Sequence, residues 1–97
     1  MIERITKNEE RLDKSIDCIN NLEKAINEFK ANKKDLSLLN KYYGSKNWFK
    51  DKEAYESNKI PKIKAGVLSE DAIWNMHEDL KEIIKEMEIL IKEYKSR

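Results

Sequence analysis

At 97 residues, with 40% charged side chains and only 2 glycines and 1 proline, the chain has the size of one small domain and predicts few turns and long helices. Hydrophobic residues make up 39% and recur periodically, which excludes a disordered chain. No apolar run approaches the roughly 18 residues of a membrane span, and the first residues lack the apolar core of a signal peptide. We therefore expect a cytoplasmic protein with no membrane association.

The first predicted element is a long amphipathic helix over about residues 2–31. Its apolar side chains recur every seven residues, with two more three positions later, and form one face; they are Ile5, Leu12, Ile19, Ile26, Leu22 and Phe29. The pattern breaks at residues 31–35, which predicts a separate short helix over about 35–43. Because no glycine or proline interrupts the break, a continuous, kinked helix stays open as an alternative.

The middle block, residues 42–74, holds both glycines, the only proline, both tryptophans and three of the four tyrosines. A short helix is predicted here over about residues 46–56. Gly44 is expected to end the preceding helix in the left-handed conformation, and Ser45 to cap the short one. Specific information is thus concentrated between two long, highly charged helices.

A loop over residues 57–68 is predicted to lead to the last helix. Pro61 disfavours helical geometry in the residue before it, and Gly66 allows a sharp turn. The last helix is expected over about residues 70–95. Ser69 has the residue type and the place of its N-cap.

The last helix has the clearest start signal and the widest apolar face of the chain. Glu70 and Asp71 suit the positive end of a helix, and Leu68 with Ile73 matches a hydrophobic staple. Three positions in each heptad are mostly apolar; they are Ile73, Leu80, Met87 and Tyr94, then Met76, Ile83 and Leu90, then His77, Ile84 and Ile91. Such a face is wider than the seam of a two-stranded coiled coil.

These elements predict a single all-α domain over residues 1–97. The two long helices have similar lengths, which favours an antiparallel pair, with the two short helices forming an insertion that caps the end where the chain turns back. The start of the first helix offers few apolar residues to the end of the last one. We therefore expect a homodimer, or a larger homo-oligomer, that forms through the end of the last helix.

The sequence contains no catalytic, cofactor-binding or metal-binding constellation. His77 is the sole histidine and Cys18 the sole cysteine, so neither has the converging partners that a metal site or a nucleophile needs. The glycines stand singly, so there is no phosphate-binding loop. We expect a protein that is not an enzyme and has no cofactor.

A cluster of aromatic side chains and one carboxylate in the middle block is the candidate partner surface. Its members are Tyr42, Tyr43, Trp48, Phe49, Asp51, Tyr55 and Trp74. Their spacing is also compatible with inward packing that closes the turn between the long helices. The leading interpretation is a protein-interaction or scaffold module with an unknown protein partner.

The alternative is a nucleic-acid-binding accessory protein. Residues 36–68 carry seven lysines against three acidic residues, and aromatic rings beside lysines can hold single strands. The block has no arginine, however, and its lysines are interleaved with acids, which makes a poor base-reading surface. Nucleic acid is thus the less favoured partner.

Two motifs stand out in the middle block. One is a Tyr-Tyr-Gly-Ser element with a following Trp and Asp, and the other is a Pro followed later by Gly-Val-Leu-Ser-Glu-Asp; their residues are Tyr42, Tyr43, Gly44, Ser45, Trp48, Asp51, Pro61, Gly66, Val67, Leu68, Ser69, Glu70 and Asp71. With these motifs the chain resembles a family of short bacterial helical proteins classed as a domain of unknown function. The resemblance extends over nearly the whole chain. It implies a cytoplasmic bacterial helical protein and assigns no activity, cofactor or catalytic residue.

Overall fold

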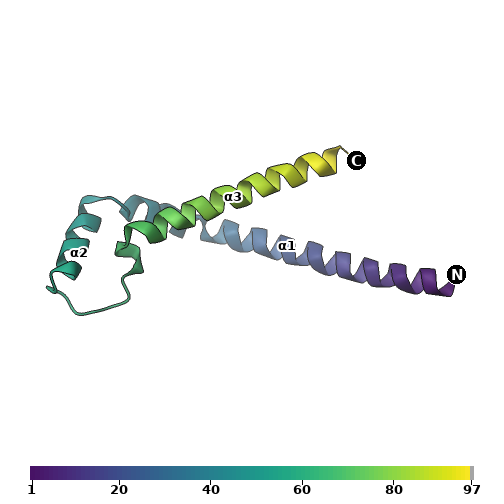
Figure 1. Ribbon diagram of the computed structural model, residues 1–97, viewed down its shortest axis with the longest axis horizontal. Helices are drawn as coiled ribbons and strands as arrows, with labels where there is room; N and C mark the ends of the chain where they lie inside the picture. Colours follow the sequence, from purple (N-terminus) through teal and green to yellow (C-terminus); the bar gives the residue numbers. More distant parts are fainter. Residues whose placement is uncertain (97) are drawn as a thin grey trace. The chain divides into compact units, whose positions relative to one another are not determined.

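The computed structural model describes residues 1–96 and is all-helical, as the sequence predicts (Figure 1). It contains the α-helices α1 (Ile2–Tyr42), α2 (Lys46–Glu56) and α3 (Glu70–Lys95), and a 3-10 turn, η1 (Gly66–Leu68). No strand occurs among the described residues. The chain divides into two units, Met1–Asn40 and Lys41–Arg97, which are described separately below.

The first unit is one uninterrupted helix. α1 runs straight through residues 31–35, so the separate helix expected over 35–43 is instead the last part of α1. The physical reason is that this stretch holds no helix breaker, and alanine and lysine rank among the better helix formers. No residue of α1 is buried, and the apolar residues of its face are exposed along its length.

The turn between α1 and α2 forms as the sequence predicts. Gly44 has a φ of +77°, in the left-handed region that a residue without a Cβ adopts most readily. The Ser45 N–H donates to the Tyr42 carbonyl at 3.0 Å. The Ser45 hydroxyl in turn accepts a hydrogen bond from the Trp48 N–H at 3.2 Å, which caps the first turn of α2.

α2 ends in a Schellman motif that the sequence interpretation did not include. Asn58 lies in the left-handed region at φ +59°, and its N–H donates to the Tyr55 carbonyl at 3.2 Å. The Lys59 N–H donates to the Ala54 carbonyl at 2.9 Å, so both bonds of the motif are present. Asparagine is the residue that most often replaces glycine just after the end of a helix, so Asn58 is the feature of the sequence that could have predicted this motif.

α3 begins with the predicted cap. The Ser69 hydroxyl accepts hydrogen bonds from the N–H groups of Asp71 and Ala72, at 3.2 and 3.4 Å. Leu68 and Ile73 are both buried, as their expected staple pairing requires. η1 contacts both α2 and α3, so this short turn joins the two helices of the second unit.

Gly44 adopts a left-handed backbone conformation and Gly66 does not, so alanine substitutions at the two positions should differ in their effect on stability. Gly44→Ala places a Cβ in the left-handed region and is expected to lower the free energy of unfolding by about 1–2 kcal/mol. Gly66 has no positive φ, and a Cβ there meets nothing within 4 Å. Gly66→Ala should therefore be neutral or stabilising by up to about 1 kcal/mol, because it restricts the unfolded chain. Urea unfolding followed by circular dichroism measures the stability of both variants. Equal effects would contradict the assignment of the left-handed conformation to Gly44 and not to Gly66.

Candidate functional site

Trp48 ties α2 to η1. Its side chain is 3% exposed, and its indole Nε1–H donates to the Val67 carbonyl at 2.9 Å. The ring packs edge to face against two neighbouring rings, Tyr43 at 5.2 Å and Phe49 at 4.9 Å between centroids. Trp48 therefore has a structural role, as the inward-packing interpretation predicts.

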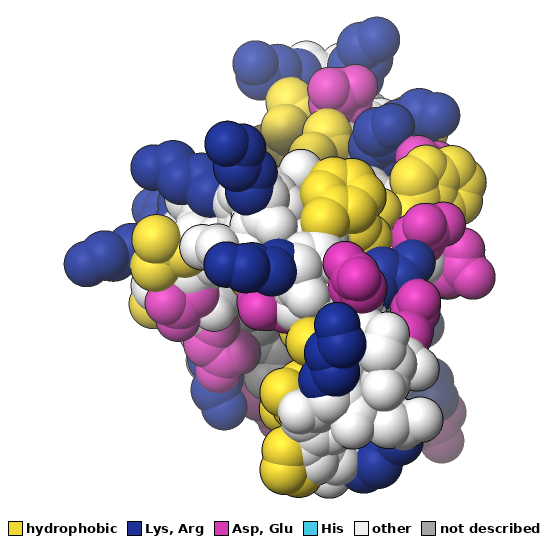
Figure 2. Space-filling view, turned by 90° about the vertical axis from the view of Figure 1, so that its left-hand side faces the viewer, with side chains coloured by type: hydrophobic (Ala, Val, Ile, Leu, Met, Phe, Trp, Pro, Cys, Tyr) yellow, Lys and Arg dark blue, Asp and Glu magenta, His cyan; other side chains and the backbone are white. Residues whose placement is uncertain are grey.

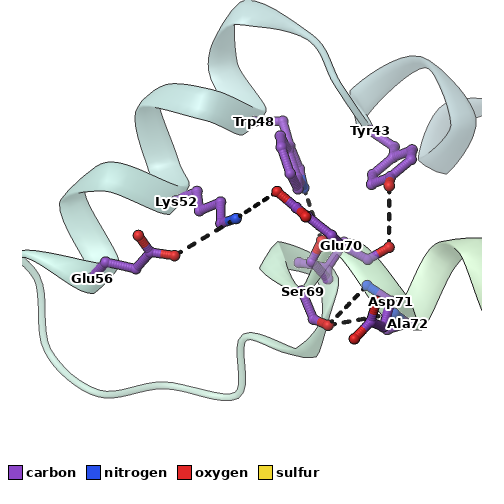
Figure 3. Close-up of polar contacts among 9 residues, drawn as sticks. Tyr43, Trp48, Lys52, Glu56, Ser69, Glu70, Asp71 and Ala72 are labelled. Carbon is purple, nitrogen blue, oxygen red and sulfur yellow. Dashed lines mark hydrogen bonds and ion pairs between the residues drawn. The ribbon is translucent and has the colours of Figure 1, made fainter.

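Two of the middle-block tyrosines fix the backbone of distant residues. The Tyr43 hydroxyl donates to the Glu70 carbonyl at 3.1 Å, which joins the turn before α2 to the first residue of α3 (Figure 3). The Tyr55 hydroxyl donates to the Ile63 carbonyl at 3.4 Å and holds the loop against α2. Both tyrosine side chains are half-buried.

Lys52 bridges α2 and α3. Its ammonium lies 3.1 Å from a Glu70 carboxylate oxygen and 3.7 Å from one of Glu56 (Figure 3). It also lies 5.3 Å from the centroid of the Trp48 ring, within the range of a cation–π interaction. The hydrogen bond to Glu70 is the main reason that the pKa of Lys52 is raised, and burial acts in the opposite direction.

Tyr42, the last residue of α1, and Asp51 of α2 form a side-chain hydrogen bond. The Tyr42 hydroxyl donates to an Asp51 carboxylate oxygen at 2.6 Å. This hydrogen bond, then burial, then the negative charge of Asp51 raise the pKa of Tyr42 from 10.0 to about 12. The phenol therefore stays neutral under physiological conditions and acts as a fixed donor.

A hollow in the surface lies beside these contacts and is the candidate functional site. It measures about 600 Å³ and is lined by Tyr43, Gly44, Trp48, Phe49, Glu70, Asp71 and Trp74. Phe49 and Trp74 are 60% and 59% exposed, so these large rings present much of their apolar surface to solvent. On the face formed by α2 and the loop, apolar side chains also reach the surface among lysines and carboxylates (Figure 2).

The family of the chain follows from comparison with known proteins. A family model described as "Domain of unknown function (DUF4298)" matches residues 5–90, which include the whole middle block. The chain belongs to this family. Comparisons with curated proteins and with solved structures give no significant match.

In this DUF4298 chain the structure separates the seven candidate surface residues into two groups. Five hold the fold: Trp48 is buried, and Tyr42, Tyr43, Asp51 and Tyr55 make the hydrogen bonds given above. Phe49 and Trp74 alone combine high exposure with a place in the hollow.

The sequence interpretation missed the central place of Glu70. It assigned this residue to the first turn of a helix, whereas its carbonyl accepts from Tyr43 and its carboxylate pairs with Lys52. A lysine one turn after a tryptophan on the preceding helix was the only signal for that ion pair. Pairings across a loop depend on tertiary structure, which local patterns do not specify.

Among residues 1–96, no group of three or more histidine, cysteine or acidic side chains is arranged to hold a metal ion. No helix in the described part of the chain combines the length and apolarity needed to cross a bilayer.

Neighbouring rings at positions 48 and 49 should differ strongly in their effect on stability. Trp48→Ala is expected to lower the free energy of unfolding by about 3–5 kcal/mol, because a buried ring and its hydrogen bond are lost. Phe49→Ala should cost no more than about 1 kcal/mol, since most of that ring is exposed. Urea unfolding monitored by circular dichroism compares the two. Similar losses would show that Phe49 is also part of the core.

The Tyr42–Asp51 hydrogen bond predicts an unusual alkaline titration. Because the pKa of Tyr42 is raised, its contribution to stability is present below pH 10 and is lost as the pH rises from about 10 to about 12. Absorbance at tyrosinate wavelengths should show one of the four tyrosines ionising near pH 12. Asp51→Asn should return that step towards pH 10, and Tyr42→Phe should abolish it. An unchanged titration in Asp51→Asn would contradict the bond.

Proposed function

We propose that the protein is a non-enzymatic interaction module of the bacterial cytoplasm, built on an antiparallel pairing of α1 and α3. The observation that supports this function is the exposure of apolar side chains at regular spacing along both long helices. Apolar stripes of this kind typically face a core or another helix, and large exposed ones mark interaction sites.

The width of the α3 stripe supports self-association as well as internal pairing. Three positions in each heptad of α3 are mostly apolar, whereas the seam between two helices uses two. One partner helix therefore covers only part of the stripe. A second copy of the chain supplies the remaining cover near the end of α3, where Ile84, Leu90 and Ile91 are exposed.

The surface around Phe49 and Trp74 is proposed as the place where a different protein binds. Exposed aromatic rings beside a hollow are typical of the residues that dominate protein interfaces. A nucleic-acid partner is less favoured, because Lys52 pairs with Glu56 and Glu70 and Lys62 lies over the Tyr55 ring. Those two lysines are engaged within the chain itself.

Two isoleucines of α3 provide a matched test of self-association. Ile91 lies on the apolar stripe and Ile89 lies two positions away, about 200° around the helix, yet they are 53% and 56% exposed. Sedimentation equilibrium of the wild type should give about twice the 11.6 kDa chain mass at high concentration. Ile91→Lys should weaken the dimer at least roughly 100-fold, because the apolar contact is lost twice in a two-fold interface.

Ile89→Lys serves as the control for the added charge and should leave the dimer intact. A wild type that stays monomeric at millimolar concentration would refute self-association. Equal weakening by the two substitutions would refute the assigned face. Circular dichroism of each variant checks that the helices still form.

A further inference from the structure

The hollow beside α2 and α3 combines aromatic rings with carboxylates. The Trp48 ring stands nearly perpendicular to both neighbouring rings, at 76° to Tyr43 and 81° to Phe49. Trp74 completes the aromatic part of the lining, and Glu70 with Asp71 supplies the only charged side chains in it. Rings in different orientations with carboxylates beside them attract an organic cation through cation–π and ionic interactions together.

Lys52 already contacts one ring and one carboxylate of the hollow. The Lys52 ammonium lies 5.3 Å from the Trp48 ring centroid and 3.1 Å from a Glu70 oxygen. Lys52 thus demonstrates, within this molecule, how a ring and a carboxylate at this place hold a positive group. It also neutralises Glu70, which leaves Asp71 as the carboxylate of the hollow with a free charge.

The remaining part of the hollow has no cation. The Asp71 side chain is exposed and makes no ion pair or hydrogen bond within residues 1–96, although its backbone N–H is held by Ser69. The Phe49 and Trp74 rings are largely open to solvent. Asp71 outweighs the roughly half positive charge of the α3 N-terminus, so the local field still favours a cation.

We propose that this hollow receives an arginine side chain from a segment of a partner protein. A planar guanidinium stacks on an aromatic face while it donates two parallel hydrogen bonds to one carboxylate, which a lysine ammonium cannot do. A volume of about 600 Å³ also exceeds the size of a small cation and accommodates the flanking peptide. The inference deepens the proposed interaction function and rests on the surface at Phe49 and Trp74 being a protein-binding surface.

Arginine and citrulline peptides form the matched pair of probes, because citrulline has nearly the same shape and no charge. The full chain, labelled with ¹⁵N, is titrated with acetyl-Gly-Arg-Gly-amide and with its citrulline counterpart, and the indole N–H signal of Trp74 is followed by NMR. Loss of the charge removes both attractions, so the citrulline peptide should bind at least roughly fivefold more weakly. The Trp48 indole signal, whose N–H is bonded to Val67, reports whether the fold is retained.

Variants of the lining locate the binding. Asp71→Asn and Trp74→Ala should each weaken the arginine peptide by roughly threefold or more. Asp79→Asn removes an exposed carboxylate of α3 that does not line the hollow, and it should change nothing. Equal binding of the arginine and citrulline peptides, or an unchanged affinity in Asp71→Asn, would overturn the proposal.

Two further peptides separate this proposal from the interaction function on which it rests. If acetyl-Gly-Lys-Gly-amide binds as tightly as the arginine peptide, the assignment to arginine fails. If acetyl-Gly-Leu-Gly-amide binds at Trp74 and the arginine peptide does not, the surface is a protein-binding one and the cation proposal alone fails. If none of the peptides binds, both fail at this surface, whereas self-association through α3 is decided by sedimentation.

Discussion

The second unit depends on the burial of one indole ring. Trp48 comes from α2 and donates its N–H to a carbonyl of η1, and η1 is the turn that positions the first residue of α3. With Leu68 and Ile73 it makes up the buried part of the described chain. Three hydrogen bonds or ion pairs surround this contact and all of them end on Glu70 or Asp51. The Asp51 and Glu70 carboxylates and the Glu70 backbone carbonyl accept these contacts and orient the elements. The burial of apolar side chains is what makes that orientation favourable in water.

Local signals in the sequence predicted the two serine caps and the glycine turn, but not the Schellman motif at Asn58. Ser45 and Ser69 cap the helices that they precede, and Gly44 adopts the left-handed conformation, because each of these outcomes depends on a few adjacent residues. The break at residues 31–35 was wrong as an element boundary. The apolar register changes there, yet the helical hydrogen bonds continue because the stretch contains no glycine or proline. A change of register alters which face is apolar and leaves the helix intact.

The candidate site was predictable only as a region. The composition of residues 42–74 marked where specific contacts are concentrated, and the structure places such contacts there. The spacing of the aromatic residues does not determine which rings are buried. Trp48 and Phe49 are adjacent in the sequence, yet Trp48 is buried and Phe49 is mostly exposed. Their difference arises from η1, which contacts α2 on one side and so covers one ring. The part of the block that is free for binding therefore follows from tertiary packing.

The buried residues of the second unit lie close together along the chain, and this has a consequence for how the unit folds. All three fall between positions 48 and 73, so the core closes over a short loop and the entropy lost in closing it is small. Folds dominated by such local contacts form rapidly. The turn made by α2, η1 and the start of α3 can therefore fold early, because its formation needs no contact with the rest of the chain.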